Sequence, residues 1–214
     1  MPSFLLKQME IGPMQNFVYF IGDPQTREVA VVDPGWEPHT ILNAAAQDQW
    51  RITHLFVTHT HFDHINALEA VLKQTDAKVC VHAQEAPFLK FAGKNILKMK
   101  NSDHVKVGNV EIQFLHTPGH TPGSQCFLVQ GNLISGDTLF IQACGRTDLP
   151  GGDPEELYLS LQDRLGKLPS ETILYPGHNY ADQLTSTLGD EKKNNPFFVP
   201  QTLQQFLQFH TKMI

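Results

Sequence analysis

A short segment of this 214-residue chain holds four side chains of the types that bind metal ions. They are His59, His61, Asp63 and His64, which stand within six residues of one another. On a loop in water the three imidazoles would repel one another once protonated, and the segment would gain nothing structural. Neutral imidazole nitrogens and carboxylate oxygens are, by contrast, favoured ligands of zinc, iron and similar ions. The segment therefore predicts a metal site.

Three further polar residues each follow an apolar run and adjoin a glycine. They are His120 after Gly119, Asp137 after Gly136, and His178 after Gly177. Glycine lets the backbone turn sharply, so each side chain can reach a shared centre. Together with the first segment they supply five histidines and two aspartates, which is enough for two ions bridged by a carboxylate.

Hydrophobic periodicity and turn signals predict the helices and strands that would position these residues. Ile65, Leu68, Val71 and Leu72 predict a helix that begins just after the histidine segment. Another helix is predicted over His39–Gln49, and a further one starts at Asp153 as its N-cap. Strands are predicted over Phe4–Met9, Asn16–Gly22, Glu28–Asp33, Ile52–Thr58, Lys78–His82, Val110–His116, Ser124–Gln130, Asn132–Gly136 and Glu171–Tyr175.

This order of elements predicts a layered α/β fold with mixed sheets, because both halves contain antiparallel hairpins as well as strands followed by helices. The candidate ligands stand where strands end, which is the usual place for chemistry in such folds. At the end of the chain, Pro200–Ile214 predicts a terminal helix with Leu203, Phe206, Leu207, His210 and Ile214 on one face. We expect this helix to pack on the body or on a second copy in a homo-oligomer.

Composition limits the partners. Sixteen Lys and Arg against 22 Asp and Glu give a net charge of −6, which argues against nucleic acid as a partner. The sequence shows no export signal and no run of 18 apolar residues, so we expect no membrane association. Three cysteines without a CxxC pair fit a reducing cytosol, and we expect a cytoplasmic protein.

The ligand motifs and their order resemble the metallo-β-lactamase superfamily. The resemblance rests on Thr58–His64 followed by Gly119-His120, Gly136-Asp137 and Gly177-His178. It implies a four-layer αββα sandwich of two mixed β-sheets, formed by one domain over 1–214 with a short helical extension at about 180–214. Within that superfamily, the chain resembles the short glyoxalase-II-like hydrolases. The segments that carry this narrower resemblance are Gln15-Asn16, Thr117–Ser124, Gly145–Asp153 and Thr185–Gly189.

The resemblance also implies the ligand sets. The first ion would be held by His59, His61 and His120, and the second by Asp63, His64 and His178, with Asp137 as the bridge. Asp63 and Asp137 would also be the catalytic residues. We expect two divalent ions, Zn²⁺ in the first place, with iron and manganese as alternatives.

For the substrate, the resemblance implies a small molecule, a thioester such as a hydroxyacyl-glutathione, cleaved by attack of a metal-bound hydroxide. Arg146 lies where that family places a basic residue near glutathione, so it is the candidate substrate-binding residue. Its alternative role is to brace its loop by pairing with Asp148 or Asp153. Full-length glyoxalase II enzymes carry a C-terminal helical domain that grips glutathione, whereas only 36 residues follow His178 here.

Two other functions are compatible with the same residues. A persulfide dioxygenase would use one iron held by His59, His120 and Asp137, act on glutathione persulfide, and share Cys144–Asp148. Such proteins usually carry Ala where this chain has Phe62, which favours the hydrolase. A non-catalytic metal-dependent binding module is the third possibility, although intact ligand sets rarely persist without chemistry.

Overall fold

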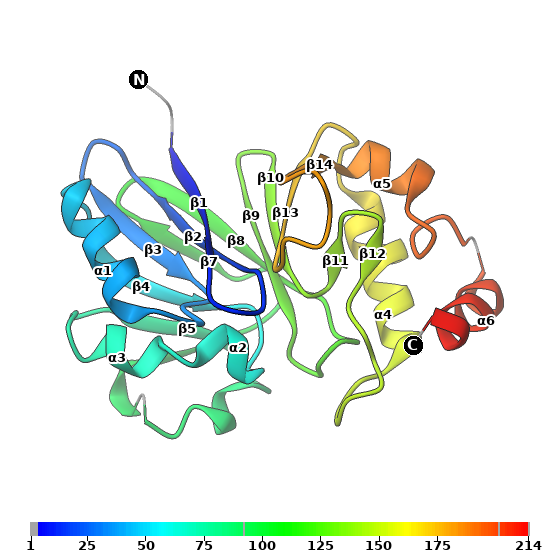
Figure 1. Ribbon diagram of the computed structural model, residues 1–214, viewed down its shortest axis with the longest axis horizontal. Coiled ribbons are helices and arrows are strands. Elements are labelled where there is room, and N and C mark those ends of the chain that lie inside the picture. Colours follow the sequence, from blue (N-terminus) through cyan, green and yellow to red (C-terminus); the bar gives the residue numbers. More distant parts are fainter. Residues whose placement is uncertain (1–3, 92, 201, 214) are drawn as a thin grey trace. The chain divides into compact units, whose positions relative to one another are not determined.

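The protein is described by a computed structural model that covers residues 4–91, 93–200 and 202–213 (Figure 1). The chain divides into two compact units, Met1–Phe114 and Leu115–Ile214. The assignment of a single domain over 1–214 remains a prediction.

The first unit is built on a six-stranded mixed sheet with the order β1-β2-β3-β4-β5-β6. Its first three strands are antiparallel, and β3 to β6 run parallel to one another. The strands are β1 (Leu5–Ile11), β2 (Asn16–Gly22), β3 (Glu28–Val32), β4 (Arg51–Val57), β5 (Lys78–His82) and β6 (Ile96–Met99).

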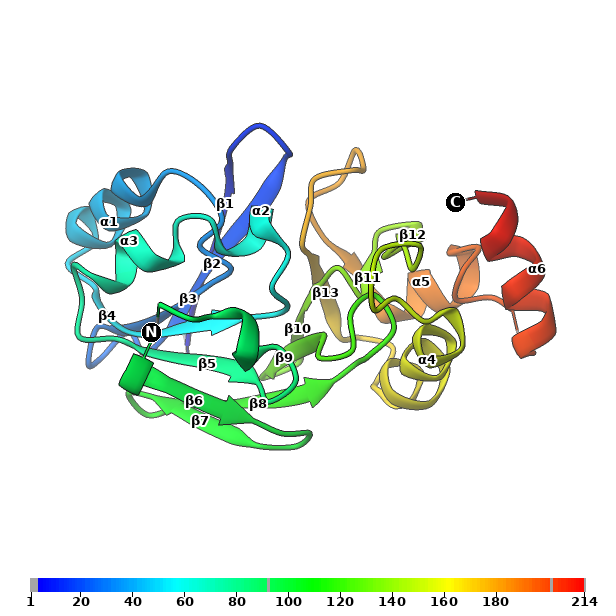
Figure 2. The same cartoon turned by 90° about the horizontal axis from the view of Figure 1, so that it is seen from below.

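Side chains of this sheet alternate between two buried faces. Leu55 and Val57 of β4 belong to a core that also contains Ile41 of α1 (Pro38–Gln47) and Leu68 of α3 (Leu68–Leu72). Figure 2 shows α1 and α3 on the same face of this sheet. Phe56, between Leu55 and Val57, points to the opposite face because successive strand residues alternate. There its ring meets Phe114 of β8 at a centroid distance of 4.9 Å.

The helix after the histidine segment differs from the prediction. It begins inside the segment, as α2 (Phe62–Ile65) with His61 as its N-cap, and not after it. It is also separated from α3, because the backbone N–H of Ala67 donates to the carbonyls of Pro34 and Gly35 instead of continuing the helix. Asp63 and His64 therefore lie on a first helical turn, whereas His59 lies on the loop after β4.

The second sheet is also mixed and has the order β14-β13-β10-β9-β8-β7. In it β10 pairs in parallel with β13 and antiparallel with β9. Its strands are β7 (His104–Val107), β8 (Val110–His116), β9 (Gln125–Val129), β10 (Asn132–Gly136), β13 (Ile173–Pro176) and β14 (Ser186–Thr187). A separate hairpin joins β11 (Leu139–Phe140) to β12 (Ala143–Cys144).

Helices cover the second unit's part of that sheet. Asp153 caps α4 (Pro154–Leu159), as predicted, by accepting from the backbone N–H groups of residues 155 and 156 at 2.9 and 3.1 Å. The helix continues through a π turn (Ser160–Arg164) and a 3-10 turn (Leu165–Lys167). Its leucines pack on Leu133 and Leu174 of the sheet.

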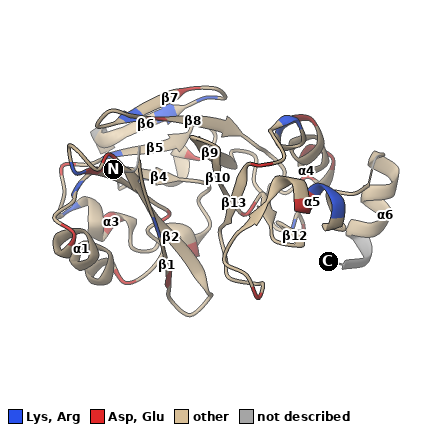
Figure 3. Ribbon diagram, turned by 90° about the horizontal axis from the view of Figure 1, so that it is seen from above, with Lys and Arg blue, Asp and Glu red and all other residues tan. Residues whose placement is uncertain are grey.

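Two further helices complete the second unit. The helix α5 (Leu188–Asn194) starts with acidic and ends with basic residues, the distribution that suits its dipole (Figure 3). The predicted terminal helix is α6 (Leu203–Met213), which buries Phe206 and His210, whereas Ile214 lies outside the described residues.

Two mixed sheets with flanking helices confirm the predicted α/β class. The strands β2, β5, β8 and β10 have the predicted bounds, and α5 lies within the predicted helical extension at about 180–214, but β6, β7, β11, β12 and β14 were not predicted. Over the described residues, every helix is too short or too polar to cross a bilayer.

Candidate metal centre

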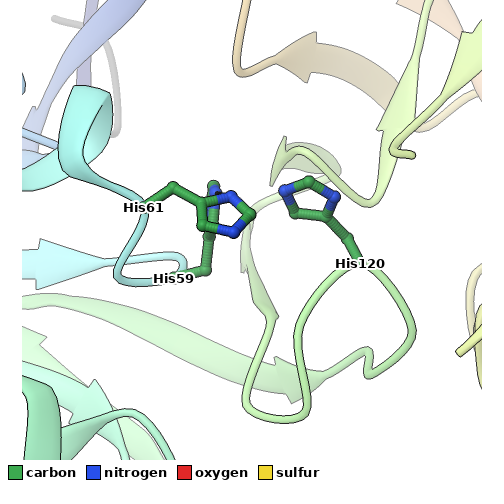
Figure 4. Close-up of side chains that lie close together, drawn as sticks. All are labelled: His59, His61 and His120. Atoms are coloured by element: carbon green, nitrogen blue, oxygen red, sulfur yellow. Dashed lines mark hydrogen bonds between the residues drawn. The ribbon is translucent and has the colours of Figure 1, made fainter. Parts of the chain in front are cut away.

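The first unit brings together His59, His61, Asp63 and His64 on the loop after β4 and the first turn of α2. Figure 4 shows the side chains of His59 and His61 on this loop. His59 and His64 are each 1% exposed and Asp63 is 6% exposed, while His61 is half-buried. Burial of this many polar side chains is unfavourable unless partners compensate them. Their partners determine what the segment can bind.

The tautomer of His59 follows from its neighbours. The Thr58 hydroxyl donates its one hydrogen to Asp33 Oδ2 at 2.6 Å, because a carboxylate can only accept. The Thr58 oxygen therefore accepts from Nδ1 of His59, 3.0 Å away, and Nε2 of His59 carries the lone pair. That Nε2 lies 3.1 Å from Nδ1 of His61. Two nitrogens bound to one tetrahedral zinc at about 2.0–2.1 Å stand roughly 3.3 Å apart, so these rings are close to that spacing.

His64 is oriented in the same way. Its Nδ1 donates to Asp33 Oδ2 at 2.9 Å, which leaves the lone pair on Nε2. This Nε2 is 3.5 Å from Oδ2 of Asp63, and two electron-rich atoms at that distance repel each other unless a cation lies between them. One ligand atom each of Asp33, His59 and His64 lies within 4.8 Å of the others.

A second buried carboxylate, besides that of Asp33, accepts hydrogen bonds from the loop that carries His59 and His61. Glu85, 2% exposed, accepts from the backbone N–H of Thr60 at 2.9 Å and also from the Thr60 hydroxyl. Thr60 stands between His59 and His61. The loop that carries these two histidines is therefore held at Thr58 by Asp33 and at Thr60 by Glu85.

The second unit brings together His120, Asp137 and His178. His120 lies on the loop between β8 and β9 (Figure 4). Asp137 follows β10 and His178 follows β13, which pair in parallel, so both residues stand at the same edge of the sheet. Gly177 permits this approach, because a Cβ there would overlap Oδ1 of Asp137.

The imidazoles of His120 and His178 both face the carboxylate of Asp137. Nδ1 of His120 donates to the carbonyl of Arg146 at 2.7 Å, so its Nε2 carries the lone pair and lies 3.7 Å from Asp137 Oδ2. Nε2 of His178 lies 3.4 Å from the same oxygen. Tyr180 stacks on the His178 ring at 4.7 Å and 9°, which limits its rotation.

The donor sets fit divalent metal ions. In each unit, a histidine whose Nδ1–H is accepted by a protein oxygen presents its Nε2 lone pair beside a carboxylate oxygen. These are His64 beside Asp63 in the first unit and His120 beside Asp137 in the second. A cation is the partner that turns this repulsion into attraction, and outer hydrogen bonds that fix the ligating tautomer are typical of metal-binding histidines. Imidazole and carboxylate together suit zinc, iron and manganese.

Arg146 is exposed and pairs with Asp148. Its Nε and Nη2 donate to the two carboxylate oxygens at 2.6 and 2.5 Å, in a bidentate arrangement. Hydrogen bonds from Arg146 lower the pKa of Asp148, and those to Asp148 raise the pKa of the guanidinium. Of the two roles expected for Arg146, the structure shows the bracing pair, and a role in substrate binding remains a prediction.

The cysteines offer no nucleophile. Burial raises the pKa of Cys80 to about 12 and that of Cys126 to about 11, and burial also raises the pKa of Cys144. All three thiols are therefore protonated at neutral pH, and a thiol is far less nucleophilic than a thiolate.

Sequence reasoning assigned no role to Asp33, Glu85 or Asn16, which donates to Asp63. Asp33 offered one signal, since it stands between an apolar strand and Pro34-Gly35. Asn16 belongs to the Gln15-Asn16 pair that contributed to the family resemblance, but the sequence did not indicate its role. Glu85 offered no signal, because it reaches the site from a distant part of the chain.

Comparison with known proteins also points to a metal-binding protein. The sequence model of a protein family, described as the metallo-beta-lactamase superfamily, matches residues 11–178 of the chain. The probable polyketide biosynthesis zinc-dependent hydrolase PksB of Bacillus subtilis (strain 168) is 29% identical over 197 residues, which cover 92% of this chain and 88% of PksB. A hydroxyacylglutathione hydrolase of Nitrosococcus oceani is 37% identical over 185 residues, which cover 84% of this chain and 68% of that enzyme. The crystal structure of ETHE1 from Myxococcus xanthus is 32% identical with a TM-score of 0.88, and the match covers 98% of this chain and 91% of that one.

Proposed function

Because the chain belongs to the metallo-beta-lactamase superfamily of metal-dependent hydrolases, we propose that it is a dinuclear thioester hydrolase of glyoxalase II type. The observation that carries the proposal is that buried Nε2 lone pairs of His64 and His120 face carboxylate oxygens, one in each unit. The similarity to a hydroxyacylglutathione hydrolase supports the substrate class.

In this proposal His59, His61 and His120 hold one ion, and Asp63, His64 and His178 hold the other. Asp137 is the ligand common to both. Zinc is the proposed metal, since PksB is named as zinc-dependent, and iron and manganese are the alternatives that the same donors accept.

Two bound divalent ions would lower the pKa of a coordinated water from 15.7 to about 7 and polarise the thioester carbonyl. The chain's own groups do the rest. Asp63 and Asp137 orient the attacking water and can accept its proton at a carboxylate oxygen. Asp33 keeps the proton of His64 on Nδ1, and the carbonyl of Arg146 does the same for His120.

Arg146 is proposed to bind a carboxylate of the thiol portion of the substrate. Its present partner, Asp148, uses the same bidentate geometry that a substrate carboxylate would use. The pair is exposed, so exchange of one carboxylate for the other needs no unfolding. Arg146 would therefore act on substrate affinity more than on the chemical step.

The second candidate function is a mononuclear iron persulfide dioxygenase. The segment Cys144–Asp148, in which this chain resembles persulfide dioxygenases, favours it. One iron would then be held by His59, His120 and Asp137, and glutathione persulfide and dioxygen would be the substrates.

Metal analysis of anaerobically purified protein, with thioester hydrolysis and oxygen-uptake assays on the same sample, separates these functions. The proposal expects two ions per chain, hydrolysis of hydroxyacyl-glutathione and no oxygen uptake with glutathione persulfide. One iron per chain with persulfide-dependent oxygen uptake would replace it by the dioxygenase. Bound metal with neither activity would indicate a binding module.

A further inference from the structure

A buried amide connects a tryptophan to one of the proposed ligands. Asn16, at the start of β2, is 1% exposed, and its Nδ2 donates to Asp63 Oδ2 at 3.0 Å. Its Oδ1 accepts from Nε1 of Trp36 at 2.8 Å. The three side chains thus form a continuous hydrogen-bonded row from indole to carboxylate.

Only one orientation of the Asn16 amide satisfies both neighbours. The indole N–H of Trp36 can only donate, and the ionised carboxylate of Asp63 can only accept. A flipped amide would place N–H against N–H at one end and oxygen against oxygen at the other. The identity of Trp36 therefore determines that Asn16 presents a donor to Asp63.

Trp36 is itself held in place. At Gly12, whose φ of 84° favours glycine, a Cβ would overlap the Trp36 ring. On another side the ring makes an edge contact with Phe62 at 5.9 Å and 90°. Phe62 immediately precedes Asp63, and 61% of its surface is exposed. The indole is thus fixed between a turn of the first hairpin and the metal-binding segment.

We propose that Asn16 is a positioning residue for Asp63, oriented by Trp36, and that this row sets the metal affinity of the ligand set that contains Asp63. The proposal rests on the proposed function, in which Asp63 is a ligand. A hydrogen bond to a carboxylate restrains its rotation and so keeps its oxygens oriented toward a metal ion. Loss of such an outer partner typically weakens metal affinity by about 10- to 100-fold.

Tryptophan fluorescence can report whether metal binding affects the hydrogen-bonded row of Trp36, Asn16 and Asp63, because the chain has only two tryptophans. Trp50 packs on Phe20 at 5.3 Å and lies outside the row, so Trp50→Phe leaves Trp36 as the one indole. Zinc titration of the metal-free Trp50→Phe protein should change the Trp36 emission. The same titration of a Trp36→Phe protein, which retains Trp50, should leave the emission unchanged.

The affinity test uses Asn16→Ala in competition with a chromophoric zinc chelator. We expect one of the two zinc dissociation constants to rise about 10- to 100-fold and the other to stay at the wild-type value. Asn109→Ala is the matched control, because Asn109 Nδ2 also donates to a carboxylate of the first unit, Asp23, at 2.7 Å, but not to a proposed ligand. Its two constants should equal those of the wild type.

If Asn16→Ala does not fold, Trp36→Phe carries the test, because it removes the indole N–H and frees the amide to flip. Trp36→Phe should raise the same zinc dissociation constant that Asn16→Ala raises. Wild-type constants in the folded Asn16→Ala protein, or in Trp36→Phe where that variant carries the test, would overturn the positioning role and leave the proposed function standing. A wild-type protein that binds no second zinc ion would overturn both.

Discussion

The most informative single change is Asp33→Asn, which alters one oxygen of the carboxylate below the metal-binding loop. Asp33 has a φ of 48°, a conformation that Asn adopts about as readily as Asp, so the backbone cost is small. The change preserves volume and replaces one acceptor by an NH₂ group. Its effect therefore comes from the hydrogen bonds of one side chain.

The size of the effect on stability follows from the three groups that donate hydrogen bonds to the Asp33 carboxylate. They are the N–H of Thr58 at 2.7 Å, the Thr58 hydroxyl at 2.6 Å and Nδ1–H of His64 at 2.9 Å. With Asn, at least one buried donor faces another donor, at a cost of about 1–3 kcal/mol, and the remaining bonds lose their charged acceptor at about 1 kcal/mol each. A total of about 3–5 kcal/mol lowers the Tm by roughly 6–20 °C for a protein of this size.

Thermal unfolding by circular dichroism, together with the zinc dissociation constants, tests this estimate. Zinc affinity should also fall, by about 10- to 100-fold, because the His64 ring loses the partner that fixes its tautomer. Asp23→Asn is the control, since Asp23 likewise accepts backbone N–H groups, from Gln25 and Asn109, but touches no proposed ligand. It should leave zinc affinity unchanged. An Asp33→Asn protein with wild-type Tm and zinc affinity would refute the reasoning.

Three further outcomes are expected. Asp137→Ala should cost more turnover and more bound metal than His120→Ala, because it alone removes a ligand common to both ions; wild-type turnover would contradict the bridge. Arg146→Ala should raise KM for a glutathione thioester by roughly tenfold or more and leave kcat near the wild-type value. An unchanged KM would mean that Arg146 only braces its loop through Asp148. Burial lowers the pKa of His210, so the unfolded chain binds more protons than the folded chain below about pH 6.5, and the Tm should fall as the pH drops through that range. His210→Phe should flatten this dependence, and equal slopes in both proteins would exclude His210 as its source.

Sequence patterns predicted the strands that are buried on a face and failed for the short edge strands. Val110–His116 has the predicted bounds because its apolar residues alternate over seven positions. The strands β6 and β7 each lie at the edge of a sheet, and each carries an exposed lysine, Lys98 in β6 and Lys106 in β7. Charged residues on edge strands prevent pairing with other chains. In β6 the sequence Ile-Leu-Lys-Met does not alternate, and in β7 the alternation extends over only four residues, so neither strand stands out in the sequence.

The ligands and their supports differ in how far apart they lie along the chain. Four proposed ligands share one short segment, because a loop and a first helical turn can aim His59, His61, Asp63 and His64 at one region, and such spacing is visible in a sequence. The supports are distant: Asn16 is 47 residues from Asp63, and Glu85 is 25 residues from Thr60. Strand register brings them close, and register depends on the packing of the whole sheet. A motif can therefore predict that a metal binds, whereas its affinity depends on residues that only the fold brings to the site.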